Sequence, residues 1–119
     1  MSTTIVGKVY VFQVMFLDVT NAPKAADSPK IDVFKFSPSG VKTYLVQQDD
    51  MFPADPVEVG RYTYPFVVPY TLTTGDVVYG EMSGMDAELN IRMVVEDQVS
   101  IGPNPSGDYL SGIKARFVK

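Results

Sequence analysis

Turn-forming residues interrupt this sequence at short intervals, and that spacing constrains the fold more than any other feature. The chain of 119 residues contains nine glycines and nine prolines. Turn signals recur roughly every 8 to 15 residues, which leaves no segment with convincing helical periodicity. The segments between the turns are rich in Val, Tyr and Phe, which favour strands. We therefore predict an all-β fold, an antiparallel β-sandwich built as a single domain.

Two pairs of predicted strands have the pattern of hairpins. Residues 31–36 and 41–46 flank the sequence SPSG, whose proline and glycine suit a tight turn. Residues 60–84, GRYTYPFVVPYTLTTGDVVYGEMSG, contain two aromatic-rich segments on either side of TTGD, and we expect their rings to form core within a second hairpin. Pro65 lacks an amide donor, which predicts an edge strand or a bulge at this position.

The first predicted strand, within residues 8–19, is apolar on both of its faces. Such a strand needs cover on both sides, so we expect either a central strand or a strand that also contacts another subunit. One face carries Val9, Val11, Met15 and Leu17, and the other carries Tyr10, Phe12, Val14 and Phe16.

Two further segments have the composition of connections, and a third has the pattern of a strand. Residues 20–30 should form a loop, and residues 47–59 an acidic connector or an edge segment. Residues 87–95 show the clearest alternation in the chain, and we expect one side of it to be buried. That side consists of Ala87, Leu89, Ile91, Met93 and Val95.

The predicted sandwich domain spans residues 1–101, and a linker with a C-terminal strand or arm spans residues 102–119. Residues 102–112 are rich in Gly, Pro and Ser. In residues 113–119, IKARFVK, the apolar Ile113, Ala115 and Phe117 alternate with Lys114, Arg116 and Val118. A strand that follows a linker can close its own sheet or add to the exposed edge of a neighbour, and both alternatives stay open.

The absence of histidine and cysteine restricts the chemistry of this chain. It excludes Ser-His-Asp and Cys-His catalysis and the zinc sites built from those ligands, and no glycine-rich phosphate loop is present. A net charge of −4 opposes binding to nucleic acid. Gln13 and Asp18 interrupt the apolar segment near the N-terminus, so we expect neither a signal peptide nor a membrane span. We predict no enzymatic activity and no cofactor.

Carboxylates are the remaining candidates for chemistry. A group in the acidic connector could hold calcium, but a solvated loop is the simpler interpretation because no EF-hand pattern is present. This group consists of Asp49, Asp50, Asp55 and Glu58. Glu81 and Asp86 have the residue types of a glycosidase pair, yet two acids beside a turn most often serve solubility.

Five aromatic residues could instead line a groove for carbohydrate or peptide. They are Tyr62, Tyr64, Phe66, Tyr70 and Tyr79. Core packing is the simpler interpretation, because alternation with β-branched neighbours is what a buried sheet face requires. Tyr70 follows Pro69 outside this alternation, and we expect its ring to be exposed.

Several motifs occur in an order that resembles one group of proteins. The order is FLDV, then IDVFKFSPSG, then the acidic connector, then VGRYTYPFVVPYTLTTGDVVYGEMSG, and it covers about residues 8–84. It resembles the small immunoglobulin-like β-sandwich proteins of tailed-bacteriophage structural modules. The resemblance implies an immunoglobulin-like sandwich of about seven to eight strands. It also implies a non-enzymatic virion protein, such as a capsid decoration (cement) protein or a tail or neck component, and it transfers no catalytic residue.

We therefore expect a virion structural protein, made in the host cytoplasm, that binds copies of itself and a larger assembly such as a phage capsid or tail. The alternative function is a carbohydrate- or peptide-binding module that uses exposed aromatic residues. The predicted contact residues are Phe52 and Tyr70 in loops and Tyr109, Leu110, Ile113 and Phe117 in the C-terminal arm.

Overall fold

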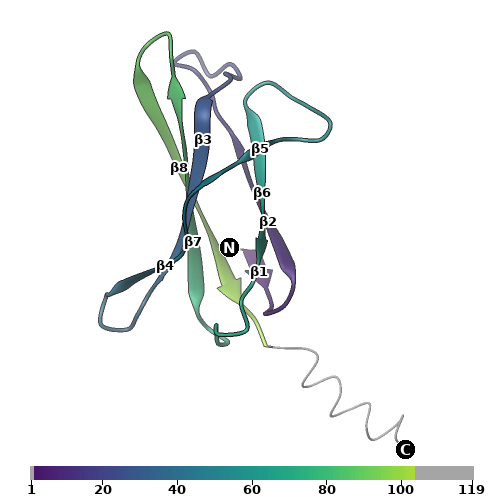
Figure 1. Ribbon diagram of the computed structural model, residues 1–119, viewed down its shortest axis with the longest axis vertical. Helices are drawn as coiled ribbons and strands as arrows, with labels where there is room; N and C mark the ends of the chain where they lie inside the picture. Colours follow the sequence, from purple (N-terminus) through teal and green to yellow (C-terminus); the bar gives the residue numbers. More distant parts are fainter. Residues whose placement is uncertain (1, 104–119) are drawn as a thin grey trace, which may run out of the picture.

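The computed structural model describes residues 2–103, which form a sandwich of two β-sheets (Figure 1). These residues contain eight strands and no helix, so the predicted all-β fold is confirmed. The strands are β1 (Ser2–Thr4), β2 (Val9–Met15), β3 (Asp27–Phe36), β4 (Lys42–Asp50), β5 (Phe52–Pro53), β6 (Arg61–Val67), β7 (Val77–Asp86) and β8 (Ile91–Ile101).

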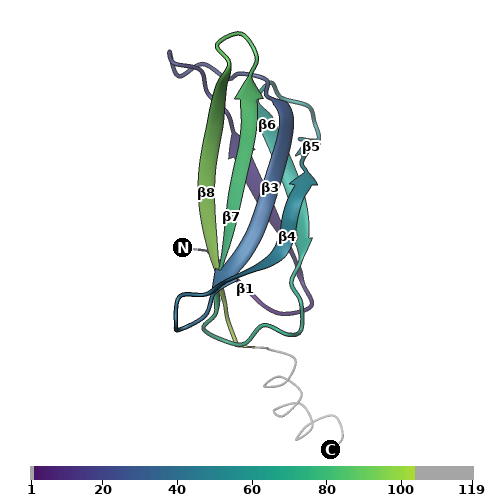
Figure 2. The same cartoon turned by 60° about the vertical axis from the view of Figure 1, so that its left-hand side comes forward.

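The two sheets differ in width (Figure 2). One has five strands in the order β1-β8-β7-β3-β4, and the other has three in the order β2-β6-β5. Neighbouring strands are antiparallel except β1 and β8, which pair in parallel. This order is consistent with an immunoglobulin-like arrangement, in which two antiparallel sheets are joined by crossing connections.

The core lies between the sheets and consists of side chains from alternate positions of the strands. Phe12 and Phe66 face inward from the three-stranded sheet, and Val78 and Met82 face inward from the five-stranded sheet. Gly80 makes room for Phe12, because a Cβ at this glycine would lie 2.5 Å from Phe12 Cε1. Burial of side chains of this size contributes about 1.5 to 3 kcal/mol each, which holds the two layers together.

Strands β3 and β4 form the first predicted hairpin. Gly40 in its turn has a φ of 88°, a left-handed conformation that glycine adopts without steric cost. Both strands are longer than expected, since β3 begins at Asp27 and β4 continues to Asp50. The loop prediction is therefore wrong for residues 27–30. Within residues 47–59 the edge-segment alternative is confirmed for residues 47–50 of β4 and for β5, since both strands lie at sheet edges. Proline and acidic residues indicated turns here, whereas β-bulges let the backbone ladder continue.

The second predicted hairpin is wrong, because β6 and β7 belong to different sheets. Strand β6 pairs with β2 and β5, whereas β7 pairs with β3 and β8. The connection, residues 68–76, buries Val68 and Leu72 and crosses from one layer to the other. A local turn does form at TTGD, where the Asp76 amide donates to the Thr73 carbonyl at 3.0 Å. Core burial, and not the turn, determines which sheet each strand joins.

Pro65 lies in the middle strand of the three-stranded sheet but occupies a local edge. Strand β2 pairs with it through Val11, while β5 pairs only with Thr63 and Tyr62. On the β5 side no strand of the described residues lies beside Pro65, so its missing amide donor interrupts no ladder. The predicted edge strand or bulge is therefore wrong, because β6 is the middle strand and pairs regularly with β2, and Pro65 is tolerated because β5 ends before it.

Strand β8 begins later than the predicted alternation, because residues 87–90 form a turn. Ile91 and Val95 project from the inner side of the sheet but remain exposed. Ala87 and Leu89 in the turn are exposed too, so the expected burial is wrong except at Met93, which packs against the core. The three-stranded sheet is narrower and leaves this part of β8 uncovered. Strand β8 ends at Ile101, and the predicted linker and arm, residues 102–119, lie outside the described residues from residue 104 onward and stay a prediction.

Candidate functional site

An apolar group covers part of the outer face of the three-stranded sheet. Val9 lies opposite Val67 and Val11 lies opposite Pro65 across the β2–β6 pair, so the four side chains adjoin one another. Val9, Val11 and Val67 are 56%, 43% and 64% exposed. The outer face of a sandwich sheet is usually polar, so this group, hereafter the apolar outer face, has the composition of a contact surface.

Strand β2 is apolar on both faces, as the sequence indicated. Phe12, Val14 and Phe16 are buried, whereas Val9 and Val11 are exposed. The strand lies at the edge of its sheet, so the alternative of a central strand is wrong. Its outer apolar side is uncovered within residues 2–103, and contact with another subunit stays a prediction.

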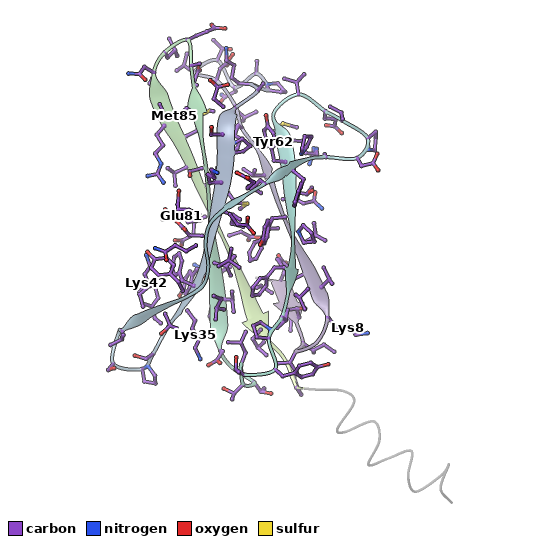
Figure 3. The ribbon with its side chains drawn as sticks, in the orientation of Figure 1. Lys8, Lys35, Lys42, Tyr62, Glu81 and Met85 are labelled. Carbon is purple, nitrogen blue, oxygen red and sulfur yellow. The ribbon has the colours of Figure 1, made fainter. Side chains whose placement is uncertain are left out.

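A second group, hereafter the aromatic cluster, lies on the outer face of the five-stranded sheet. It consists of Phe34, Phe36, Tyr44 and Tyr79, from strands β3, β4 and β7. Phe34 stacks on Tyr79 with ring centroids 5.6 Å apart. Lys42 Nζ lies 4.0 Å from the centroid of the Phe34 ring, a cation–π geometry. Figure 3 shows Lys42 on the side of this sheet that faces away from the three-stranded sheet.

The rings of the aromatic cluster differ in exposure. Phe34 is buried by its aromatic neighbours and by Lys42, whereas Phe36 and Tyr44 are exposed. A depression of about 300 Å³ adjoins the cluster and is lined in part by Phe36, Tyr79 and Asp76. Exposed rings beside a carboxylate are groups that can contact a sugar or a peptide.

The carboxylate of Asp76 already has partners within the fold. It accepts hydrogen bonds from the Thr73 amide at 2.9 Å and from Lys35 Nζ at 3.4 Å. The Thr73 amide is the main cause that lowers the pKa of this carboxyl, and the charge of Lys35 lowers it further. Asp76 therefore stabilises the turn before β7 and is ionised at neutral pH.

The sequence did not single out Phe34, Phe36 or Tyr44 as site residues. Ile31 and Val33 of β3 are fully buried between the sheets, so the alternate positions 34 and 36 face outward. The segment IDVFKF is apolar on both faces, as β2 is, and that pattern was the available signal.

The five aromatic residues predicted to line one groove do not lie together. Phe66 is buried, and Tyr62 and Tyr64 pack against the core, so core packing is confirmed for these three residues. Tyr62 lies between the sheets (Figure 3), where its hydroxyl donates to the Ala26 carbonyl at 3.3 Å. Tyr79 belongs to the aromatic cluster on the outer face, and Tyr70 is exposed in the β6–β7 connection, as predicted.

Tyr64 links the two sheets through a polar contact at their margin. Its hydroxyl donates to Asp49 Oδ2 at 2.6 Å. Burial, followed by the contact with the Asp49 carboxylate, raises the pKa of Tyr64 to about 12. The same hydrogen bond is the main cause that lowers the pKa of Asp49. This pair joins β6 of one sheet to β4 of the other.

The acidic residues at 49–58 make separate contacts. Asp50 pairs with Lys30, and the Arg61 Nε donates to Glu58 Oε2 at 3.1 Å. Among residues 2–103, no three Asp or Glu side chains converge closely enough to hold a metal ion. The contacts in the structure therefore give these carboxylates roles within the fold.

Glu81 and Asp86 do not form a carboxylate pair. They lie at odd and even positions of β7 and so project from opposite faces of the sheet. Asp86 is buried, and its Oδ1 accepts from the amides of Glu88 and Leu89 at 3.0 and 3.3 Å, which closes the β7–β8 turn. Glu81 lies on the outer face, where Arg92 Nη2 is 3.8 Å from its Oε1.

Two of the six predicted contact residues lie in the described part of the chain. Phe52 is exposed, but it belongs to the short strand β5 and not to a loop, and its ring stacks with Tyr64 at 6.5 Å. Tyr70 is exposed, and its hydroxyl end lies against Gly7, where a Cβ would be only 2.4 Å away. Tyr109, Leu110, Ile113 and Phe117 lie outside the described residues.

No family model matches the sequence, and no curated protein and no solved structure is significantly similar to it. Across residues 2–103, no helix has the length and apolar character needed to cross a membrane.

Proposed function

We propose that this chain is a non-enzymatic virion structural protein, a capsid decoration or a tail- or neck-associated subunit that acts through protein–protein contacts. The observation that carries the proposal is the apolar outer face, four adjoining apolar side chains on a sheet surface that usually carries polar residues. The tailed-phage setting rests on the resemblance of residues 8–84.

The shape and chemistry of the apolar outer face support a contact with another protein. The surface belongs to a sheet, so a second sheet can pack on it face to face, as sheets do within a sandwich. Its side chains are already about half covered, so full burial of each would contribute on the order of 1 kcal/mol. In a shell with many copies, the small free energies of the individual contacts would add up, which suits a protein that assembles.

The test compares two lysine substitutions on one strand and one face. Val11→Lys places a charge within the apolar outer face, and Gln13→Lys places the same charge two residues further along β2, opposite Thr63. We expect the unchanged chain to self-associate as its concentration rises, with a mass that falls in Val11→Lys and persists in Gln13→Lys. Light scattering after size-exclusion chromatography measures the mass, and equal masses for the three proteins would contradict the proposal.

A second candidate function is a carbohydrate- or peptide-binding module. The aromatic cluster favours it, because Phe36 and Tyr44 expose ring surface beside the depression that Asp76 helps to line. This function predicts saturable binding on a glycan or peptide array that is lost in Phe36→Ala and kept in Tyr70→Ala, since Tyr70 lies in a different connection. An array without any signal would count against it.

A further inference from the structure

Strand β8 has a long free edge. Strand β7 pairs with it over residues 91–100 on one side, but on the other side β1 pairs only with residues 99–101. Figure 2 shows β8 along the margin of the sheet. Within the described part of the chain, no strand continues β1 along residues 91–98, so the backbone groups on that side can pair with another strand.

From Ile91 to Val95 the side chains along this edge are apolar on the inner face of the sheet, and Asp97, the next inner position, accepts a hydrogen bond from the Tyr10 hydroxyl at 3.1 Å. Register with β7 places Val95 beside Met82 and Met93 beside Gly84, both of which are buried. Ile91 and Val95 themselves are 49% and 40% exposed. Proteins usually protect an edge strand with charges, proline or a bulge, and here the exposed inner positions are apolar instead.

A small depression lies beside the same edge. Its volume is about 140 Å³, and its lining comes from residues 17–19 after β2 and from residues 86–93, which include the start of β8. The apolar lining residues are Leu17, Val19, Leu89, Ile91 and Met93, and the carboxylates of Asp18 and Asp86 complete the lining. Leu17, Val19 and Leu89 are all exposed, so a strand laid along the edge would cover apolar surface on its inner side as well as pair its backbone.

The outer side of the edge carries a pair of carboxylates. Glu96 of β8 lies directly opposite Glu81 of β7. Arg92 is the cation in contact with this group, 3.8 Å from Glu81. A strand with apolar residues on one side and basic residues on the other therefore matches both faces of the edge.

Residues 113–118 of this chain, IKARFV, have that pattern. Ile113, Ala115 and Phe117 alternate with Lys114 and Arg116, and this segment contains no acidic residue. Directly opposite residues of paired strands share a face, so one register aligns the apolar positions with Ile91, Met93 and Val95.

The connecting residues are long enough to deliver this strand. The described chain passes Gly102, whose amide donates to the Thr4 carbonyl at 2.7 Å at the end of β8 that β1 occupies. Residues 103–112 can span up to about 33 Å when extended, which exceeds the distance of about 10 to 30 Å back along a strand of this length.

We propose that residues 113–118 add to residues 91–98 of β8 as a further β-strand, with the apolar side of the segment on Ile91, Met93 and Val95. The pairing itself does not depend on the proposed function. It rests on that function only where the strand comes from a neighbouring copy, because the pairing then joins copies into the assembly.

Hydrogen exchange on the full chain tests the pairing with two matched variants. Phe117→Lys places a charge on the covered side of the segment, and Val118→Lys places the same charge on the next residue, which faces the other way. We expect every second amide of residues 91–98 to exchange roughly tenfold faster in Phe117→Lys than in Val118→Lys, because the first variant opens the added strand. Equal exchange rates in the unchanged chain and both variants would overturn the proposal.

Disulfide cross-linking identifies the copy that supplies the strand. The chain has no cysteine, so pairs of introduced cysteines report unambiguously. Met93→Cys is combined with Ile113→Cys, Ala115→Cys or Phe117→Cys, either within one chain or on separate chains that are then mixed. A disulfide between chains supports the pairing and its part in assembly, and a disulfide only within the chain supports the pairing alone.

Absence of a disulfide in every combination would overturn the pairing and leave the proposed function intact. The proposed function fails separately, when Val11→Lys and Gln13→Lys leave the mass of the protein equal.

Discussion

Gly80 sets the local separation of the two sheets, because the Phe12 ring occupies the space where a side chain would stand. Two atoms of that ring, Cε1 and Cδ1, would lie 2.5 and 2.7 Å from a Cβ at position 80. Phe12 is fully buried and its ring also packs edge-on against Tyr10, with centroids 4.9 Å apart, so it has little room to move. The glycine and the ring form one unit of the core.

We predict that Gly80→Ala destabilises the protein by about 1 to 3 kcal/mol, the usual cost of overpacking a core. Phe12→Leu removes ring atoms from the same place, so the double variant Gly80→Ala with Phe12→Leu should lose less stability than the sum of the two single variants. Urea unfolding of the four proteins measures the coupling. Additive losses would show that the two residues do not share this space.

The Tyr64–Asp49 hydrogen bond gives the fold a dependence on pH at both ends of the scale. The pKa of Tyr64 is raised to about 12, so its contribution is complete below pH 10 and is lost as the pH rises toward 12. The pKa of Asp49 is lowered, so its contribution is present above the ordinary carboxyl pKa and is lost as the pH falls below it.

We therefore predict that Tyr64→Phe makes the free energy of unfolding less dependent on pH in both the acidic and the alkaline range. The variant loses the alkaline decline that comes from Tyr64, and it becomes less sensitive to acid because the main cause that lowers the pKa of Asp49 is removed. Urea unfolding at a series of pH values measures both effects, and Tyr70→Phe, at an exposed tyrosine, is the control. If the free energy of unfolding varied with pH in the same way in Tyr64→Phe and in the unchanged chain, this hydrogen bond would not be the cause of the pH dependence.

At the scale of the strands, β4 depends on a bulge at Gln48. Its φ is 50°, a left-handed conformation that costs non-glycine residues energy. Asp32 of β3 holds this bulge, because its Oδ1 accepts from the Gln48 amide at 2.7 Å and its Oδ2 accepts from Gln48 Nε2 at 2.8 Å. The bulge changes the β3–β4 register and so allows β4 to continue to Asp50.

Replacement of Gln48 separates backbone strain from the side-chain contact. Gln48→Ala and Gln48→Gly both remove the Nε2 hydrogen bond, but only glycine adopts a positive φ without strain. We expect the glycine variant to be more stable than the alanine variant by about 1 kcal/mol, despite the lower strand propensity of glycine. Thermal unfolding of the two proteins measures the difference. A more stable alanine variant would mean that residue 48 leaves the left-handed region in solution.

At the scale of the whole molecule, exposed apolar groups occur on both sheets. The apolar outer face lies on the three-stranded sheet, and the aromatic cluster and the free edge of β8 belong to the five-stranded sheet. The chain as a whole carries a net charge of −4, which opposes association of copies at low ionic strength. Contact through the apolar outer face must therefore overcome a general repulsion.

This balance predicts how salt affects self-association. Sodium chloride at about 1 M shortens the Debye length to about 3 Å and removes the repulsion, so the mass of the oligomer should hold or rise. Ammonium sulfate should raise it further, because sulfate strengthens apolar burial. Light scattering in both salts measures the response. If the oligomer dissociated in sodium chloride, charged contacts and not apolar ones would hold the copies together.

The sequence by itself determined the strand content, the β3–β4 hairpin, the two-faced character of β2 and the exposure of Tyr70. These features depend on residues close together in the chain, through turn chemistry and alternation. The absence of histidine and cysteine is also a property of the sequence alone, and it excludes catalysis and zinc sites that depend on those side chains.

Only the tertiary structure decided which face of each strand is covered and which sheet it joins. Strands β6 and β7 flank a good turn, yet they belong to different layers, because the connection buries Val68 and Leu72 in the core. Phe34 faces outward because Ile31 and Val33 take the inner positions, and Val95 stays exposed because the opposing sheet is two strands narrower. Alternation divides a strand into two faces, but only long-range packing determines which face meets the core.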